Sequence, residues 1–261
     1  MSPSWLERVT ITLSPHQVTM VRYARGLRRV LKDSKVLPCP ACVEGENWQP
    51  ALDTLRDALV HPNTEAGDAI VVLSNHFVRY LLLPWNPDLV TVQEELAFVR
   101  ARFVRAFGKA ANGWVVKFSP GRPGAAGVAC AIESPLLDAV TALMAGSPLR
   151  LRSIQPSFMA VCNARRRAPR GNAWVAMAEP GRLLLGSLHE GQWLSLRSRP
   201  MNGHASSLRD IIKQESMLLG VESNGGQIYL HRTSDAVINL EGVDVELWLP
   251  EAKVRAGERA N

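Results

Sequence analysis

The order of the expected strands and helices is the feature that most constrains the fold, because one pattern occurs twice. In the first half, hydrophobic periodicity predicts strands at residues 9–14, 17–24 and 29–39, the last with a polar bend at Asp33, then a helix at 48–60 and a buried strand at 69–73. In the second half, it predicts a three-stranded meander at residues 173–199, a helix at 207–219 and a strand at 227–231. Each half thus has three strands, a helix and a further strand.

A second group of elements lies between these repeats. Strands are predicted at residues 77–83, 113–119 and 127–132, and helices at 91–107, 135–144 and 154–164. Thr91 and Glu94 have the spacing of a capping box at the start of the 91–107 helix. A last strand is expected at residues 243–248.

The repeated order is the layout of the ribonuclease-H-like fold, which the actin-like ATPase superfamily carries twice. The sequence therefore predicts an α/β (α+β) protein with two ribonuclease-H-like subdomains in a reduced actin-like arrangement. The first spans residues 1–150, with a small subdomain inserted at 75–133, and the second spans residues 151–250. Residues 251–261 are expected to form a flexible tail.

Composition agrees with a globular protein. Of the 261 residues, 46% are hydrophobic and 21% are charged, close to the averages of folded domains. No stretch reaches the ~18 apolar residues of a membrane-spanning helix, and the N-terminus lacks the apolar core of a signal peptide. We expect a cytoplasmic protein. The pair Cys39 and Cys42 lacks the further ligands of a zinc site, so its role stays open between a plain loop and a redox or metal motif.

Three stretches carry a resemblance beyond element order. They are a strand that ends in Leu-Pro and leads into an acidic helix (71–95), a segment with a proline followed by small and apolar residues (151–163), and the meander at 174–199. Together they resemble the PilM-like and GspL-like proteins, the actin-like cytoplasmic components of type IV pilus and type II secretion platforms. The resemblance covers residues 9–250. It implies a scaffold associated with the inner membrane through a platform protein, with a secretion ATPase as a further partner.

The resemblance also marks two turns at which actin-like proteins hold nucleotide phosphates. The first, Leu13-Ser14-Pro15, has no carboxylate, no glycine and no amide donor at its proline. The second, Glu179-Pro180-Gly181, keeps a glycine and a carboxylate, so Glu179 and Gly181 are the candidate cofactor-binding residues of a degenerate phosphate turn. We expect no ATP or other cofactor, no metal, and a plain turn role for Glu179.

Other catalytic chemistry finds no support in the sequence. A two-metal nuclease needs several converging carboxylates, and the first two predicted strands contain none. No Gly-x-Ser-x-Gly elbow occurs, and the six histidines are scattered. His76, beside Asn75, is expected to be a hydrogen-bonded polar residue rather than a base. No catalytic residue is assigned, and the chain is not expected to be an enzyme.

The net charge of +6 is the remaining signal of a partner. Arginines gather at residues 22–29, 100–105 and 165–170, without the interleaved aromatic residues that single-stranded nucleic acid favours. Peripheral contact with an anionic membrane is compatible with these clusters.

The resemblance implies a short peptide of a membrane protein bound in a groove of the first domain. Here that groove would lie at a strand edge in residues 9–24, beside the 69–74 strand and the 48–60 helix, with Arg22 and Arg25 pairing with acidic peptide residues. The sequence therefore predicts a noncatalytic scaffold. A nucleotide-binding actin-like ATPase and a basic nucleic-acid-binding module are the alternatives.

Overall fold

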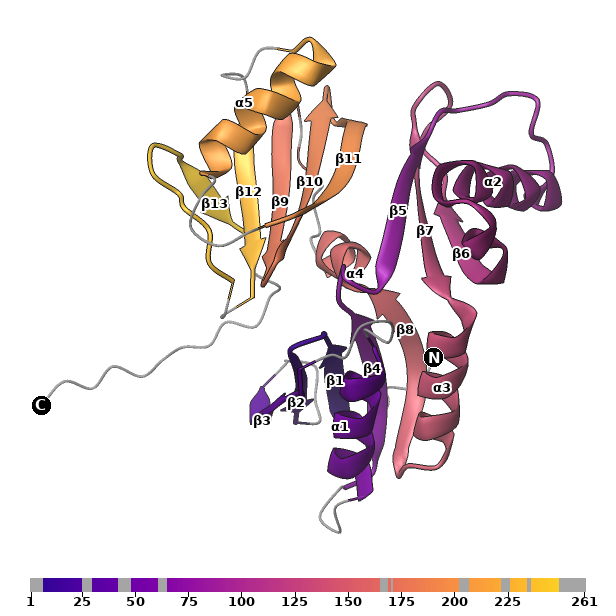
Figure 1. The fold of residues 1–261 in the computed structure, drawn as a ribbon, viewed down its shortest axis with the longest axis vertical. Helices are drawn as coiled ribbons and strands as arrows, with labels where there is room; N and C mark the ends of the chain where they lie inside the picture. The colour runs from indigo at the N-terminus through magenta and orange to yellow at the C-terminus, as the bar shows by residue number, and fades with distance from the viewer. Residues whose placement is uncertain are drawn as a thin grey trace, which may run out of the picture. The chain divides into compact units, whose positions relative to one another are not determined.

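The structure is a computed structural model, and its elements are labelled in Figure 1. It describes residues 7–24, 30–41, 48–60, 65–164, 169, 171–201, 207–221, 226–233 and 236–248. The chain forms two compact units. Unit 1 consists of Met1–Leu73, Asp138–Arg165 and Leu249–Asn261, and unit 2 consists of Ser74–Leu137 and Arg166–Trp248. The predicted tail at 251–261 lies outside the described residues.

Unit 1 is built on a five-stranded sheet. Its strands are β1 (Arg8–Leu13), β2 (Gln17–Tyr23), β3 (Leu31–Pro38), β4 (Gly67–Leu73) and β8 (Leu149–Pro156), in the order β3-β2-β1-β4-β8. The first three strands form an antiparallel meander, and β4 and β8 run parallel to β1. This is the strand, strand, strand, helix, strand order that the sequence predicts.

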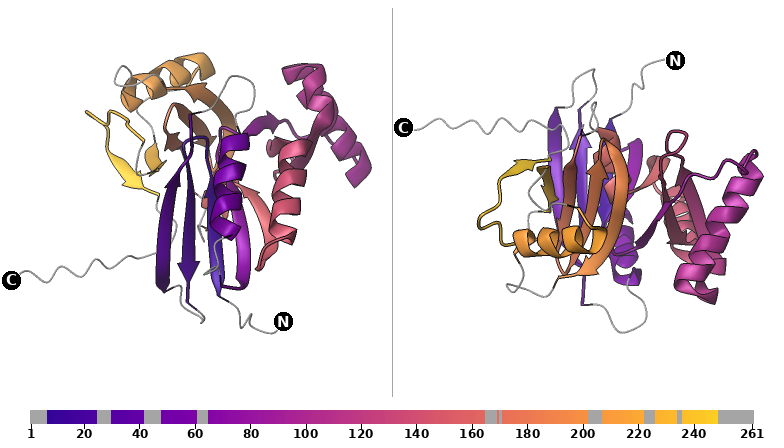
Figure 2. Two further views of the ribbon diagram at one scale, coloured as in Figure 1. Left: turned by 60° about the horizontal axis from the view of Figure 1, so that its bottom comes forward. Right: turned by 90° about the horizontal axis from the view of Figure 1, so that it is seen from above.

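Helix α1 (Gln49–Val60) packs on this sheet, as the left view of Figure 2 shows. Its buried residues Leu52, Leu55 and Leu59 recur at helical spacing, so one stripe of the helix faces the core. Helix α4 (Ser157–Ala164) contacts β4 and β8. Helix α3 (Ser134–Ala145) carries the chain from unit 2 back into unit 1.

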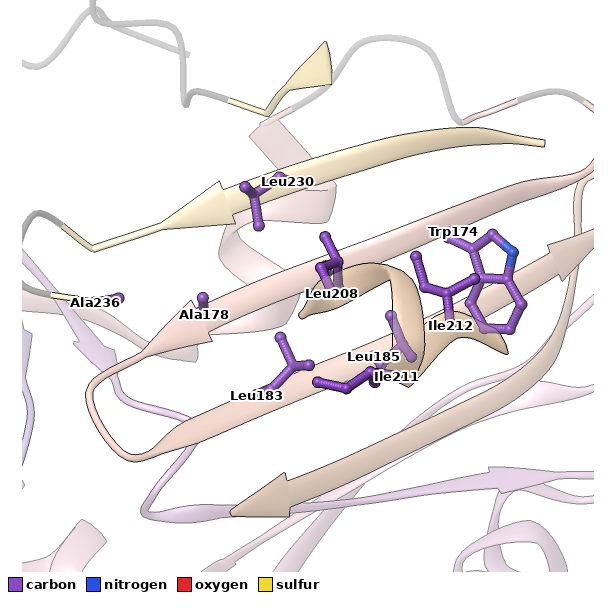
Figure 3. Close-up of a cluster of buried hydrophobic side chains, with 10 residues drawn as sticks. Trp174, Ala178, Leu183, Leu185, Leu208, Ile211, Ile212, Leu230 and Ala236 are labelled. Atoms are coloured by element: carbon purple, nitrogen blue, oxygen red, sulfur yellow. The ribbon is translucent and has the colours of Figure 1, made fainter. Parts of the chain in front are cut away.

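Unit 2 repeats the same order in a second five-stranded sheet. Its strands are β9 (Ala173–Glu179), β10 (Arg182–His189), β11 (Gln192–Pro200), β12 (Gln227–Arg232) and β13 (Val245–Leu247), in the order β11-β10-β9-β12-β13. Helix α5 (Leu208–Leu219) covers one face, and Figure 3 shows its residues Leu208, Ile211 and Ile212 in one buried cluster with Leu183 and Leu185 of β10 and Trp174 of β9. Burial of these apolar side chains holds the helix on the sheet.

A three-stranded antiparallel sheet completes unit 2. It contains β5 (Val78–Leu83), β6 (Trp114–Ser119) and β7 (Gly127–Glu133) in the order β5-β7-β6, together with helix α2 (Val92–Phe107) and the short helix η1 (Lys109–Gly113). Val99 and Phe103 of α2 share a buried cluster with Val116 and Ala129 of the sheet. Strand β5 also contacts β11.

The predicted capping box at the start of α2 is confirmed. The Thr91 hydroxyl accepts a hydrogen bond from the Glu94 amide, and the Glu94 carboxylate accepts one from the Thr91 amide. These bonds, together with one from the Val90 amide, lower the pKa of Glu94. A lowered carboxyl pKa stabilises the helix at neutral pH, and this contribution is lost as the pH falls through the folded-state pKa.

Two predicted elements differ from the structure. Residues 154–156 belong to strand β8, not to a helix, because the segment from Leu149 pairs with β4 and ends at Pro156, which cannot donate in a helix interior. Asp33 does not form a bend but lies within β3, opposite Arg22. Both β8 and α4 belong to unit 1, so the chain leaves this unit after Arg165.

Candidate functional site

The turn between β1 and β2 in unit 1 corresponds to the first candidate phosphate turn. The Ser14 amide and the Ser14 hydroxyl both donate to the Gln17 carbonyl, at 3.1 and 2.8 Å. The Gln17 amide in turn donates to Ser14 Oγ at 3.1 Å. Three donors that a phosphate could use are thus engaged inside the turn, and Pro15 has no amide proton to add a fourth.

The turn between β9 and β10 in unit 2 corresponds to the second candidate phosphate turn. Pro180 and Gly181 form its corner, and Gly181 has a φ of +72°, a conformation that favours glycine. The Gly181 carbonyl accepts a hydrogen bond of 3.0 Å from the Met201 amide. The glycine is therefore explained by the geometry of the turn itself.

Glu179, the last residue of β9, is not a plain turn residue. Its side chain is buried, with 5% of the residue exposed. Its carboxylate accepts hydrogen bonds from the Ser74 hydroxyl, from the Asn75 amide at 3.1 Å and from Asn75 Nδ2 at 2.9 Å. The expectation of a plain turn role was wrong, because these partners follow β4 more than 100 residues earlier in the chain.

A wider hydrogen-bond network surrounds this carboxylate. The Tyr80 hydroxyl donates to Asn75 Oδ1 at 2.9 Å, and His76 Nε2 lies 2.9 Å from the Pro180 carbonyl oxygen. The His76 amide donates to Ser74 Oγ at 3.1 Å. His76 is thus a hydrogen-bonded polar residue, as its sequence position predicts. The network ties residues 74–80 to the β9–β10 turn within unit 2.

The local sequence explains why residues 74–76 can serve this role. The buried strand β4 ends at Leu73, and the Phe77 amide then donates to the Ser74 carbonyl at 3.0 Å, which closes a tight turn. Sequence reasoning missed Ser74 and Tyr80 as members of the network. Three consecutive polar residues between two apolar strands were the available signal, because buried polar groups require partners.

Polar groups of both turns form hydrogen bonds within the protein. The Ser14 and Gln17 amides bond inside the first turn, and the Glu179 carboxylate next to the second turn accepts hydrogen bonds from Ser74 and Asn75. Among the described residues, no three His, Cys, Asp or Glu side chains come together as a metal site.

Arg22, a predicted partner-binding residue, lies on β2 in unit 1. Its Nη1 donates to Glu7 at 3.0 Å, and its Nη2 donates to the Glu65 carbonyl at 3.0 Å. Lys32 also contacts Glu7, at 2.8 Å, and hydrogen bonds from Lys32 and Arg22 lower the pKa of the Glu7 carboxyl. Arg22 is therefore already paired within the chain. Arg25 lies outside the described residues.

The sheet order differs from the prediction that residues 9–24 contain an edge strand. Strand β1 lies between β2 and β4, and β2 lies between β1 and β3, so neither offers an edge to a peptide. The edges of the unit 1 sheet are β3 and β8. The order places β3 outermost because the meander continues past β2 by one further antiparallel strand.

The remaining sequence candidates are spread over the chain. Cys39 is half-buried, and burial raises the pKa of its thiol, while Cys42 lies outside the described residues. Arg100 and Arg105 of α2 are exposed. Most of the basic 165–170 loop lies outside the described residues. Among the described residues, Cys39 belongs to unit 1, whereas Arg100 and Arg105 belong to unit 2.

The fold is similar to those of several solved structures. No protein-family model matches the sequence, and no curated protein matches it. The cytoplasmic domain of EpsL, an inner membrane component of the type II secretion system of Vibrio cholerae, aligns with a TM-score of 0.59 and 9% identity, covering 92% of this chain and 88% of that domain.

Two further structures align comparably. A protein of unknown function with an actin-like ATPase fold from Bacteroides thetaiotaomicron gives a TM-score of 0.57 and 11% identity, over 89% of this chain and 84% of that chain. The PilM–PilN type IV pilus biogenesis complex gives 0.56 and 17%, over 84% of this chain and 67% of that chain. These similarities confirm the predicted actin-like fold and the resemblance in structure. In the part of the chain that is described, no helix is long and apolar enough to cross a membrane.

Proposed function

We propose that this chain is a noncatalytic actin-like scaffold of a type IV pilus or type II secretion platform, and that it docks to the cytoplasmic tail of an inner-membrane protein. The fold shared with EpsL and PilM supports the class of assembly. The observation that carries the noncatalytic part is the hydrogen bonding of Glu179 by Ser74 and Asn75. A carboxylate used in this way is not available to position a metal-bound water.

The ATPase alternative predicts nucleotide binding, and the scaffold predicts none. Titration of the protein with Mg-ATP in a calorimeter is expected to give no saturable heat, because the first turn offers neither free amides nor a carboxylate. A dissociation constant below about 1 mM, which corresponds to about 4 kcal/mol of binding free energy, would favour the ATPase instead.

Strand β3 is the surface that best suits a docked peptide. It is an edge strand of the unit 1 sheet, and two of its large apolar residues are exposed to solvent, Leu31 at 46% and Val36 at 58%. An extended peptide gains main-chain hydrogen bonds at such an edge and places alternate side chains on it. We therefore place the docking edge at β3, one meander strand beyond the region that the sequence indicates.

The register of β3 shows which residues face the open edge. The Cys39 amide donates to the His16 carbonyl at 2.8 Å, so His16 and Cys39 are a hydrogen-bonded pair of the antiparallel ladder. Such pairs alternate along the ladder, which makes Val36 and Thr19 a non-hydrogen-bonded pair and directs the Val36 amide away from β2. Pro38 occupies an equivalent position, where a missing amide proton is tolerated.

The docking prediction is tested with Val36→Lys. A lysine at this exposed edge should leave the sheet intact and should weaken an incoming apolar strand, since edge lysines oppose strand addition. Immobilised cytoplasmic tails of the membrane proteins encoded beside this gene serve as bait. We expect at least tenfold weaker retention of the variant, about 1.4 kcal/mol.

Val60→Lys is the matched control, because Val60 is 77% exposed at the end of α1 and lies on no sheet edge. Equal retention of both variants would remove β3 from the docking site, and retention of no tail by the wild type would remove the docking model. Charge reversal at Arg22 and Arg25 tests the site expected from sequence. Its interpretation requires a check of folding, because Arg22 is paired with Glu7.

A further inference from the structure

Arg79 and Arg182 of unit 2 are connected through hydrogen bonds that involve His76. Arg79 is on β5, and its Nη1 donates to the His76 carbonyl at 2.9 Å. His76 Nε2 in turn lies 2.9 Å from the Pro180 carbonyl oxygen, two residues before Arg182 on β10. Strand β11 contacts both arginine-bearing strands. It packs beside β5, and the hydroxyl Oγ of its Ser198 accepts a hydrogen bond of 3.0 Å from Arg182 Nη1 of β10.

The guanidinium group of Arg182 has capacity for a further acceptor. Its Nε is buried and has no hydrogen-bond partner within the described residues. A buried donor without an acceptor is costly, and the cost is larger for a charged group. Arg182 as a whole is only half-buried, and Ser198, which accepts from its Nη1, is exposed.

The charges around Arg182 favour an added anion. Burial lowers the pKa of Arg182, the Arg79 guanidinium lowers it further, and the Glu179 carboxylate raises it. The oxygens of Glu179 already accept hydrogen bonds from Ser74 and Asn75. The two guanidinium groups repel each other, and the single negative charge of Glu179 offsets only one of their two positive charges.

We propose that Arg79 and Arg182, together with the Ser198 hydroxyl, bind a small oxyanion, the group shared by phosphates and carboxylates. An oxyanion supplies the acceptor that Arg182 Nε lacks, and it offsets the repulsion between the two guanidinium groups. The planar fork of N–H donors in arginine matches both kinds of anion. This site uses guanidinium groups and not the amides of the β9–β10 turn, and it does not depend on the docking function.

The test is a titration of the full chain with inorganic phosphate and, separately, with acetate. Sodium chloride at matched ionic strength is the reference, and protein melting temperature and calorimetric heat are the two readouts. We expect a saturable response to at least one of the two anions beyond the chloride reference. The tighter of the two identifies whether the site prefers a phosphate or a carboxylate.

Arg79→Gln and Arg182→Gln are each expected to weaken this binding at least tenfold, about 1.4 kcal/mol. Arg100→Gln is the matched control, because Arg100 is exposed on α2. Arg182→Lys keeps the positive charge and removes the planar fork of N–H donors, so it should also weaken binding. This variant tests the site if Arg182→Gln impairs folding. No saturable response in the wild type, or equal responses in the wild type and in every variant, would overturn the proposal.

Discussion

Glu179→Gln is expected to lower the free energy of unfolding by about 3 kcal/mol and the melting temperature by about 6–12 °C. The carboxylate accepts hydrogen bonds from the Ser74 hydroxyl and from two donors of Asn75, all in buried surroundings. A glutamine places an amide donor against these donors and leaves at least one of them unsatisfied. Thermal and urea unfolding, followed by circular dichroism, measure the change.

Glu190→Gln supplies the matched control for this prediction. Glu190 is also a glutamate at a hairpin turn of the same sheet, but its side chain is exposed. Its substitution is expected to change stability by less than about 0.5 kcal/mol. A similar loss for both variants would show that the hydrogen bonds of Glu179 contribute little to stability.

Leu208→Ala is expected to cost about 2–5 kcal/mol, because it removes a fully buried side chain from the core of unit 2. Leu208 lies at the start of α5 and belongs to the cluster with Leu183 and Leu230. The cavity left behind cannot be filled by the backbone of β9 and β10, which is fixed by the sheet. Urea unfolding gives the change in free energy.

Leu218→Ala on the same helix isolates the effect of burial. Leu218 is 68% exposed, so the same chemical change there removes little packing. We expect a change below about 0.5 kcal/mol, and a slight gain is compatible with the higher helix propensity of alanine. Comparable losses at the two positions would contradict the packing of α5 on the sheet.

Much of the fold is predictable from sequence because it depends on local periodicity. The spacing of Leu52, Leu55 and Leu59 indicates one buried helix face, and Thr91 with Glu94 indicates a helix start. Strand β8 is not predicted from the sequence, because it leads directly into helix α4 at Ser157 and the end of the strand reads as the start of the helix.

The site depends on contacts that sequence spacing does not reveal. Glu179 and Gly181 read as a degenerate phosphate turn, and only the structure places Ser74 and Asn75 against the carboxylate. Arg22 reads as a partner-binding residue, and its pairing with Glu7 arises because the meander brings β2 beside the start of β1. Hydrophobic periodicity does not predict which polar side chains pair when they lie far apart in the sequence.

The tie between Ser74 and Glu179 has a consequence for synthesis on the ribosome. The two residues are 105 positions apart, and at about 5–20 residues per second the ribosome needs about 5–20 s to make the intervening chain. The antiparallel sheet of β5, β6 and β7 has closer partners and can form from its own contacts before Glu179 has emerged. Until Glu179 emerges, the Ser74 hydroxyl and the Asn75 amide, which lie just before β5, have only water as an acceptor in its place. The folding of unit 2 is therefore completed only after β9 has left the exit tunnel.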